Sequence, residues 1–197
     1  MQIISNSCLG SFIYEKLNLK FNNPFTWNRI YYADMLKLCK NFNNINFENF
    51  TLTRKELLLG INIDNILNLY YPHYKYNSAC ITPITKHESD GNNLYMDNKI
   101  FQFILDVYNK RVSRLNKNDK PIYVIQSNRY DYTDNNVYEF LKLPIKMILF
   151  TNNNKLKKFE DKYHKIIVFE KSLINIDPKN LLISKLFNYI DQLKTIN

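Results

Sequence analysis

Residues 121–126 read PIYVIQ, a short apolar run that ends on a polar residue. A continuous apolar run of this length is typical of a strand that is buried on both faces. Thr133 can cap a helix that continues to Leu143, and residues 146–151, KMILFT, form a second apolar run. A strand, a capped helix and another strand in this order predict a βαβ unit with parallel strands.

Similar elements are predicted toward both ends of the chain. They are a strand, a polar turn and a helix at residues 2–5, 6–10 and 11–17, a last strand at 165–169, and a closing amphipathic helix that begins at Asp177-Pro178. Strands that alternate with helices favour a sheet covered by helices on both faces. We therefore expect an α/β protein, of the three-layer α/β/α type with a mostly parallel sheet, and a single domain over residues 1–197.

The middle of the chain is harder to assign. Apolar residues at helical spacing predict two helices, at residues 32–42 and 99–116. Short strands are predicted at 26–30 and 79–85, and polar loops at 71–77 and 86–98. Residues 50–69 fit neither the helical nor the strand period, so no element is predicted there.

The composition points to an anionic partner. The formal net charge of the 197 residues is +9, which favours a nucleotide-bearing cofactor, an acidic glycan, nucleic acid or a membrane face. The three cysteines form neither a disulfide framework nor a C-x-x-C zinc pair. The N-terminus resembles no signal peptide, and no apolar run has the length of a membrane span. We expect a cytoplasmic protein, at most peripheral to a membrane.

Several motifs, in order along the chain, resemble those of one family. Residues 3–10, IISNSCLG, resemble the opening I-I-S-N-N-C-x-G-G of a family of unknown function labelled exopolysaccharide biosynthesis. Further similar stretches follow at 14–24, 111–116 (RVSRLN), 122–131 and 143–151 (LPIKMILFT). The resemblance implies a step in making a surface polysaccharide, with a sugar or polysaccharide precursor as substrate.

The chain departs from that family pattern at two places. Ser7 stands where the family has a second Asn, and Ser11 where it has a second Gly. The family also tends to have an H-Y-K-S sequence before R-V-x-R, and two stretches compete as its counterpart. Residues 86–89, KHES, fit the position of the family motif in the chain better, whereas His73-Tyr74-Lys75 match its residue types better.

Cys8 is the strongest candidate for chemistry, because it lies between the first predicted strand and the helix that follows. Backbone N–H groups and the helix dipole at such a position lower the pKa of a thiol and can hold an oxyanion. Asn6 would add a side-chain donor, and His87, after a predicted strand, would be the base of an acyl transfer. The alternatives are a small buried residue for Cys8 and a surface-loop residue for His87. Cys39 and Cys80 are expected in the core.

Two further groups are candidates for binding. Arg111 interrupts the apolar stripe of the helix at 99–116, flanked by Lys110 and Arg114. These cations would hold the phosphates of a cofactor such as coenzyme A, unless Arg111 only extends its head to water. Asn128 and Asp131 follow the strand at 121–126 and would orient a sugar, although Asn and Asp are also favoured in turns.

The sequence excludes several classes of site. It contains no Walker loop, dinucleotide fingerprint, metal-ligand set or G-x-S-x-G elbow, and three glycines are too few for a glycine-rich phosphate loop. The favoured function is acyl (acetyl) transfer in exopolysaccharide or capsule synthesis, without a metal. Two alternatives remain, a glycosyltransferase-like enzyme of the same pathway and a non-catalytic basic domain that binds nucleic acid.

Overall fold

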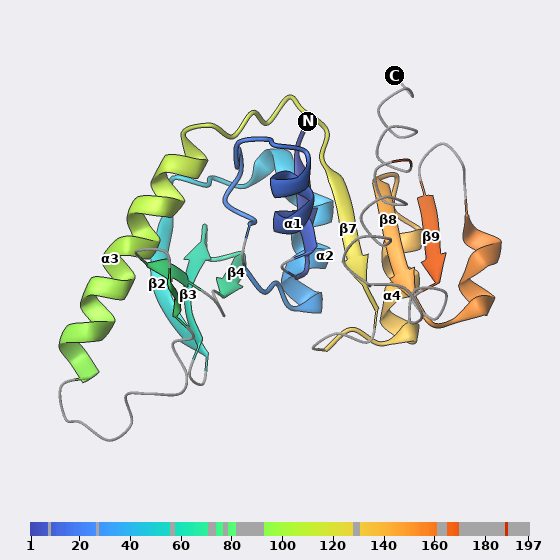
Figure 1. Cartoon of the computed structure of the whole chain (residues 1–197). Helices are drawn as coiled ribbons and strands as arrows, with labels where there is room; N and C mark the ends of the chain where they lie inside the picture. The colour runs from blue at the N-terminus through green and yellow to red at the C-terminus, as the bar shows by residue number, and fades with distance from the viewer. Residues whose placement is uncertain are drawn as a thin grey trace.

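The computed structural model describes residues 1–7, 9–26, 28–55, 58–70, 74–76, 79–81, 93–127, 131–160, 165–169 and 188. Its helices and strands are shown in Figure 1. In chain order they are β1 (Ile3–Ser5), α1 (Leu9–Lys16), α2 (Tyr32–Asn41), the 3-10 helix η1 (Phe42–Asn44), β2 (Phe50–Lys55), β3 (Leu58–Ile63), β4 (Leu67–Tyr70), β5 (Tyr74–Tyr76), β6 (Ala79–Ile81), α3 (Asn93–Val112), β7 (Ile122–Gln126), α4 (Asp134–Leu141), β8 (Lys146–Thr151), the 3-10 helix η2 (Asn154–Phe159) and β9 (Lys165–Phe169).

Four strands form a parallel sheet in the order β1-β7-β8-β9. Ile4 pairs with Tyr123, Val124 with Ile148, and the register continues from β8 to β9. The strands predicted at 2–5, 121–126, 146–151 and 165–169 are thereby confirmed. The chain is an α/β protein, as expected from the buried apolar runs.

Both faces of this sheet are buried, which explains why its strands are continuously apolar. Alternate residues of β7 belong to two different cores: Ile122 and Val124 to one, Tyr123 and Ile125 to the other. Helix α1 packs into the first core, and helices α2 and α4 pack into the second. Figure 1 shows α1 in front of the strands and α2 behind them. The full three-layer arrangement stays a prediction.

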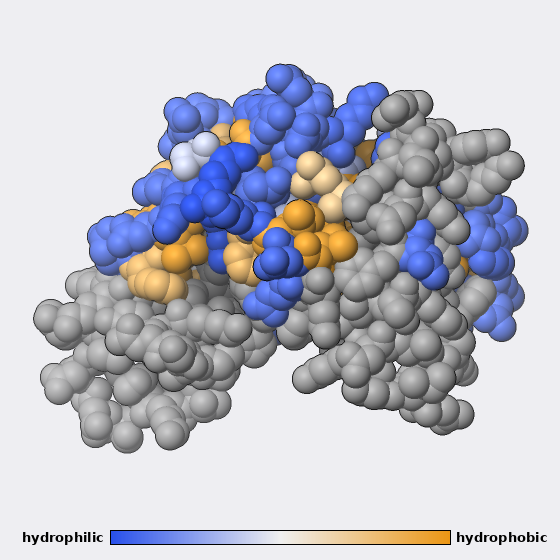
Figure 2. All heavy atoms as spheres, turned by 45° about the horizontal axis from the view of Figure 1, so that its top comes forward, coloured by the Kyte–Doolittle hydropathy of each residue, from blue (hydrophilic) through white to orange (hydrophobic). Residues whose placement is uncertain are grey.

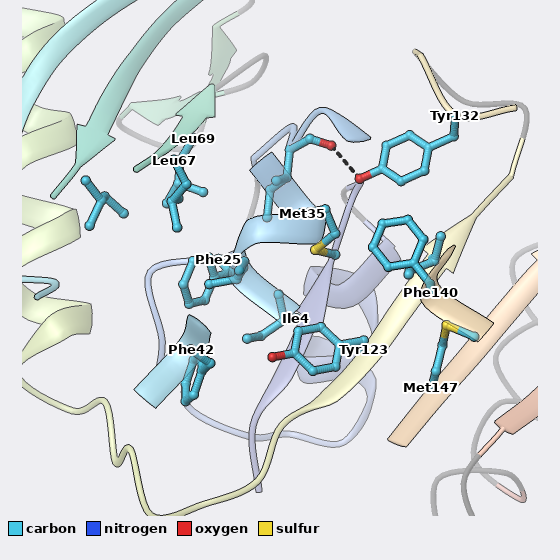
Figure 3. Close-up of a cluster of buried hydrophobic side chains, with 14 of the residues drawn as sticks. Ile4, Phe25, Met35, Phe42, Leu67, Leu69, Tyr123, Tyr132, Phe140 and Met147 are labelled. Carbon is cyan, nitrogen blue, oxygen red and sulfur yellow. Dashed lines mark hydrogen bonds between the residues drawn. The ribbon is translucent and has the colours of Figure 1, made fainter. Parts of the chain in front are cut away.

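A second, antiparallel sheet extends the larger core. Strands β2, β3 and β4 form a meander, and its buried residues share one cluster with α2, α3 and the parallel sheet. Figure 3 shows Leu67 and Leu69 of β4 next to the part of the core that contains Phe25 and Met35. Gly60 allows β3 and β4 to approach, since a Cβ atom there would lie 2.5 Å from the carbonyl oxygen of Leu69. The meander was not predicted.

The helices were predicted better than the meander, because their sequence signals are local. Thr133 caps α4 as expected, and its side chain and that of Asn136 form a reciprocal capping box. The helix predicted at 32–42 is α2, with η1 following it. The helices expected at 11–17 and 99–116 are α1 and α3, each of which begins earlier than predicted.

Several predictions for the middle of the chain are wrong. The described residues of the range 26–30 form no strand; Arg29 makes only an isolated antiparallel bridge to Tyr70. The loop predicted at 71–77 contains β5, which pairs antiparallel with β6, so the strand at 79–81 lies outside the parallel sheet. The loop predicted at 86–98 is helical from Asn93. Asn and Asp residues flank the apolar residues 94–96 there, so the sequence shows no helical pattern. The helix expected from Asp177 lies outside the described residues.

Candidate functional site

The carboxyl ends of parallel strands are where α/β proteins usually bind ligands, and here that edge is held together by Asn6. The Asn6 side chain accepts a hydrogen bond from the backbone N–H of Gln126 and donates one to the carbonyl oxygen of the same residue, both at 3.0 Å. This amide extends the β1–β7 pairing by one more step. Asn6 is fully buried, so it fixes the point where β1 turns into the following loop.

Ser7 adds a second connection between the same segments. Its hydroxyl donates to the Gln126 side-chain oxygen at 2.5 Å and accepts from the Leu9 N–H at 3.4 Å. The Ser7 N–H in turn donates to the hydroxyl of Ser5. The short connection between β1 and α1 is therefore tied to β7 on one side and to the first turn of α1 on the other.

Two more buried hydroxyl residues, Ser127 and Thr151, lie at the ends of β7 and β8. The Ser127 N–H donates to the Phe150 carbonyl at 2.8 Å, which continues the ladder past β7. The Thr151 hydroxyl accepts from the Asn153 N–H at 3.0 Å. Polar residues thus replace apolar ones where three neighbouring strands end.

The N-terminus of α2 meets this edge as well. The Ile30 N–H donates to the Asn6 carbonyl at 3.4 Å, and the Tyr132 hydroxyl donates to the Ile30 carbonyl at 2.9 Å. Figure 3 shows the Tyr132 ring beside Phe140 and its hydroxyl directed at this partner. The carboxylate of Asp131 accepts from the Tyr32 N–H at 2.9 Å. A residue expected to orient a sugar therefore also caps α2.

Asp34, in the first turn of α2, is a buried acid that the sequence analysis did not select. Burial raises the pKa of its carboxyl group, although the Asn68 amide, 3.4 Å away, and Lys37 and Lys55 act in the opposite direction. Burial and the nearby Asp34 charge also raise the pKa of Tyr70. A signal was available: Asp34 lies four residues before buried Leu38, on the same side of the helix.

The predicted cofactor-binding cations lie near the C-terminus of α3. Arg111 is half-buried, donates to the Thr26 carbonyl at 2.8 Å and has its guanidinium 5.1 Å from the centre of the Phe21 ring. Arg114 is exposed and donates to the Phe21 carbonyl at 3.2 Å, and Lys110 is exposed. One hydrogen-bond donor of each guanidinium group is therefore already bonded to a backbone carbonyl.

Three predicted site residues, Cys8, His87 and Asn128, lie outside the described residues. The proposed pairing of Cys8 with His87 stays a prediction. Cys39 is half-buried against the larger core, and burial raises the pKa of its thiol well above the usual range. That environment fits the packing role expected for Cys39.

The described part of the chain contains neither a candidate metal centre nor a candidate membrane span. No group of three or more His, Cys, Asp or Glu side chains there is arranged to hold a metal ion. Of the helices that the structure describes, none is both long and apolar enough to cross a membrane.

The fold and this edge define an α/β protein with a parallel sheet whose strand ends carry a braced polar cluster. The chain belongs to the family described as Domain of unknown function (DUF1919), whose model matches residues 1–197. This match confirms that the chain belongs to a family of unknown function, whereas the exopolysaccharide label and the family motifs stay predictions. No curated protein matches the chain.

Proposed function

We propose that the protein is a group-transfer enzyme of surface-polysaccharide synthesis, and that it transfers an acyl group at the carboxyl edge of its parallel sheet. The observation that carries this proposal is the double bracing of the β1–α1 connection by Asn6 and Ser7 on Gln126. A catalytic group needs a fixed geometry, and this connection is fixed on both sides of residue 8.

The chemistry follows from the position of Cys8 in the chain. His87 would take the proton of the Cys8 thiol, and the thiolate would attack the carbonyl carbon of a thioester donor to form an acyl-cysteine. The C–S bond of the donor would break, and its thiolate would leave with the proton from His87. A sugar hydroxyl would then attack the acyl-cysteine and regenerate the thiol, with His87 as the proposed base. Backbone N–H groups at the start of α1 would stabilise the oxyanion in both steps. Asn6, whose amide is committed to Gln126, would act as a positioning residue.

The segment at residues 21–30 is where coenzyme A would bind as the donor. This segment contacts Arg114 at Phe21, Arg111 at Thr26 and the edge itself, through the bond from Ile30 to Asn6. The segment runs from the α3 cations to the carboxyl edge; at its start, Asn22 bonds to the Met1 carbonyl before β1, so Arg114 lies toward the amino end of the sheet. Two buried side-chain oxygens along it, on Thr26 and Asn28, have no hydrogen-bond partner within the described structure. In this proposal the donor would extend along the segment from the carboxyl edge, with its phosphates held by Lys110 and Arg114, both of which are exposed.

The test is the capture of an acyl-enzyme. The intact protein is incubated with acetyl-coenzyme A, quenched in acid and weighed by mass spectrometry, and the modified peptide is sequenced. We expect one acetyl group on Cys8, lost in the Cys8→Ser variant and retained in Cys39→Ser, which removes a half-buried cysteine and serves as the matched control. An unmodified protein, or acetylation that persists in Cys8→Ser, would exclude Cys8 as the nucleophile.

A further inference from the structure

The face of the meander that points away from the core carries a row of polar side chains. Ile61 of β3 and Leu69 of β4 belong to the larger core. Because successive side chains of a strand point to opposite faces, their neighbours Asn62 and Asn68 lie on the outer face. Thr51 of β2 pairs with Asn62, which in turn pairs with Asn68, so the three side chains form one row across the three strands. Thr51 is exposed and both asparagines are half-buried, so a ligand can reach the row.

Asp34 of α2 lies at one end of this row and determines how its amides are oriented. The Asn68 side-chain N–H donates to the Asp34 carboxylate at 3.4 Å, and the Asn62 side-chain N–H donates to the Asn68 side-chain oxygen at 2.9 Å. An ionised carboxylate only accepts hydrogen bonds, so each amide turns its nitrogen toward Asp34 and its oxygen away. The side-chain oxygen of Asn62 bonds to no other residue that the structure describes. The row therefore presents an oriented acceptor beside the Thr51 hydroxyl.

The charges near the row already interact within the protein. Burial raises the pKa of Asp34, and the charges of Lys37 and Lys55 act in the opposite direction, so both lysines lie within electrostatic reach of the carboxylate. The Lys37 ammonium also donates to the Ile66 carbonyl at 3.0 Å, and the Lys55 ammonium lies 3.5 Å from the centre of the Tyr31 ring. The row thus offers hydrogen-bonding groups and not an uncompensated charge, which favours a neutral ligand over an anion.

The row lies close to the carboxyl edge of the parallel sheet. Asp34 is in the first turn of α2, and Tyr31 precedes this helix. The residue before Tyr31 is Ile30, whose N–H donates to the Asn6 carbonyl at 3.4 Å. Burial is the main cause that raises the pKa of Tyr132, and the charge of Asp34 also contributes, so Asp34 is near a side chain that bonds to Ile30. A chain-like ligand on the row can therefore extend to the edge where the acyl transfer is proposed.

The exposed hydrophobic residues lie elsewhere. Figure 2 shows one face of the molecule, on which the described residues are mainly hydrophilic and the hydrophobic ones gather in small patches. Of the residues that the structure describes, Leu19 and Leu52 are the large hydrophobic ones with exposed side chains. Leu52 pairs with Ile61 and so belongs to the opposite face of the meander from the row. Among the described residues, then, the row has no large exposed apolar side chain that would favour an apolar partner.

We propose that this row binds a neutral, hydroxyl-rich sugar of the polysaccharide acceptor. The choice of a sugar rests on the proposed acyl transfer, which needs a hydroxyl-bearing acceptor. A sugar hydroxyl donates to the Asn62 oxygen and a neighbouring hydroxyl of the same ring accepts from Thr51, so one ring satisfies both side chains. A phosphate or carboxylate group only accepts hydrogen bonds and would place its oxygens against the Asn62 oxygen.

The probes are maltotetraose, cellotetraose and N-acetylchitotetraose, with tetragalacturonic acid as the acidic comparison, titrated into the full chain by calorimetry. We expect at least one neutral probe to bind with a Kd of about 1 mM or below, and the acidic probe to bind at least about fivefold more weakly than that one. Absence of binding by all three neutral probes up to about 10 mM would overturn the proposal, and so would an acidic probe that binds as tightly as the neutral one.

Two double variants locate the site. Thr51→Val/Asn62→Ala removes the hydroxyl and one amide of the row, whereas Asn43→Ala/Asn44→Ala removes two exposed amides of η1. We expect the affinity for the bound tetrasaccharide to fall about tenfold or more in the first variant and to stay within about twofold in the second. Equal losses in both would overturn the placement.

Asp34→Asn distinguishes a binding role from a structural one and does not depend on the folding of the double variant. Asparagine can direct its own nitrogen toward Asn68, so the row loses its fixed orientation, while the cost of a buried charge disappears. We expect the sugar affinity to fall about threefold or more, with a Tm at neutral pH no lower than that of the native protein. Unchanged affinity would overturn the role of Asp34 in the site. Cys8→Ser should bind the sugar as the native protein does, and an acyl-cysteine without sugar binding would refute this proposal alone.

Discussion

Replacing Asn6 with alanine tests whether the carboxyl edge is held as described. The Asn6→Ala variant leaves both the N–H and the carbonyl oxygen of Gln126 without their present partners. Each orphaned buried group costs about 1–3 kcal/mol. Because Gln126 is half-buried, water can partly replace the lost bonds, so we expect a total of about 2–4 kcal/mol. For a chain of this size that lowers Tm by roughly 4–16 °C.

The assay is urea unfolding followed by circular dichroism, with Asn136→Ala as the matched control. Asn136 makes the same two kinds of bond, accepting from the Thr133 N–H at 2.8 Å and donating to the Asp131 carbonyl at 3.0 Å, but these lie on the exposed surface. Its loss should cost about 0.5–1 kcal/mol. If Asn6→Ala costs no more than Asn136→Ala, the bracing at β7 contributes no more than a surface cap, and the reasoning about a fixed edge fails.

Four further outcomes are expected. Burial raises the pKa of Asp34, so the folded protein keeps the Asp34 proton at pH values where the unfolded chain has lost it. The stability that this proton contributes is present at low pH and is lost as the pH rises. Measured by urea unfolding, Asp34→Asn should therefore gain stability relative to the native protein between acid and neutral pH. Asp64→Asn should show the opposite pH dependence in the same urea measurements and lose stability relative to the native protein as the pH rises, because hydrogen bonds from Asn46 and Asn49 lower the pKa of Asp64. Gly60→Ala should destabilise the meander by about 1–3 kcal/mol, since its Cβ would clash with backbone; a melting curve identical to that of the native protein would contradict this. Iodoacetamide should modify Cys8 at lower pH than Cys39, whose pKa is raised by burial, and equal rates would assign both cysteines to packing.

The parallel sheet could be predicted because its signal is local. Each of β7 and β8 is buried on both faces, so every residue from Tyr123 to Ile125 and from Met147 to Phe150 is apolar or aromatic. A continuous apolar run of four or five residues followed by a polar turn has few other uses in a chain of this size. The capping box at Thr133 is equally local, since it needs two residues three positions apart.

The meander was missed because a run of leucines hides its period. From Leu59 onward, buried apolar side chains alternate with Gly60 and Asn62, which is the strand period of two. Leu57 and Leu58, directly before, break that alternation in the sequence. Asp64 and Asn65 both have positive φ and form the turn to β4, a position that Asn and Asp tolerate well. Reading the Asp64-Asn65 pair as a turn would have recovered the hairpin.

The contacts of the candidate site could not be predicted in the same way. The loop containing Asn6 was selected from its position after the first strand, but its bond to Gln126 joins residues 120 positions apart. Asp131 caps α2 across 99 positions. Both contacts depend on strand register and on the placement of α2, which no periodicity reveals. The sequence identified polar residues at strand ends, and the fold determined which backbone groups they bond.

The two ends of β7 are apart in the structure, and this separates the effects of changes made at each end. Tyr123 is buried near the amino end of β7, and Gln126 anchors Asn6 three residues later. That spacing corresponds to about 10 Å along a strand. Strand β7 lies between β1 and β8, and its residues from Ile122 to Ile125 are buried, so it resists local distortion. Losses of stability caused by Tyr123→Ala and by Asn6→Ala should therefore add within about 0.5 kcal/mol when the two substitutions are combined, as they do for sites without shared partners. A larger coupling energy, measured by urea unfolding of the double variant, would mean that β7 transmits a shift from its amino end to the carboxyl edge, and the edge could then not be treated as a separately fixed unit.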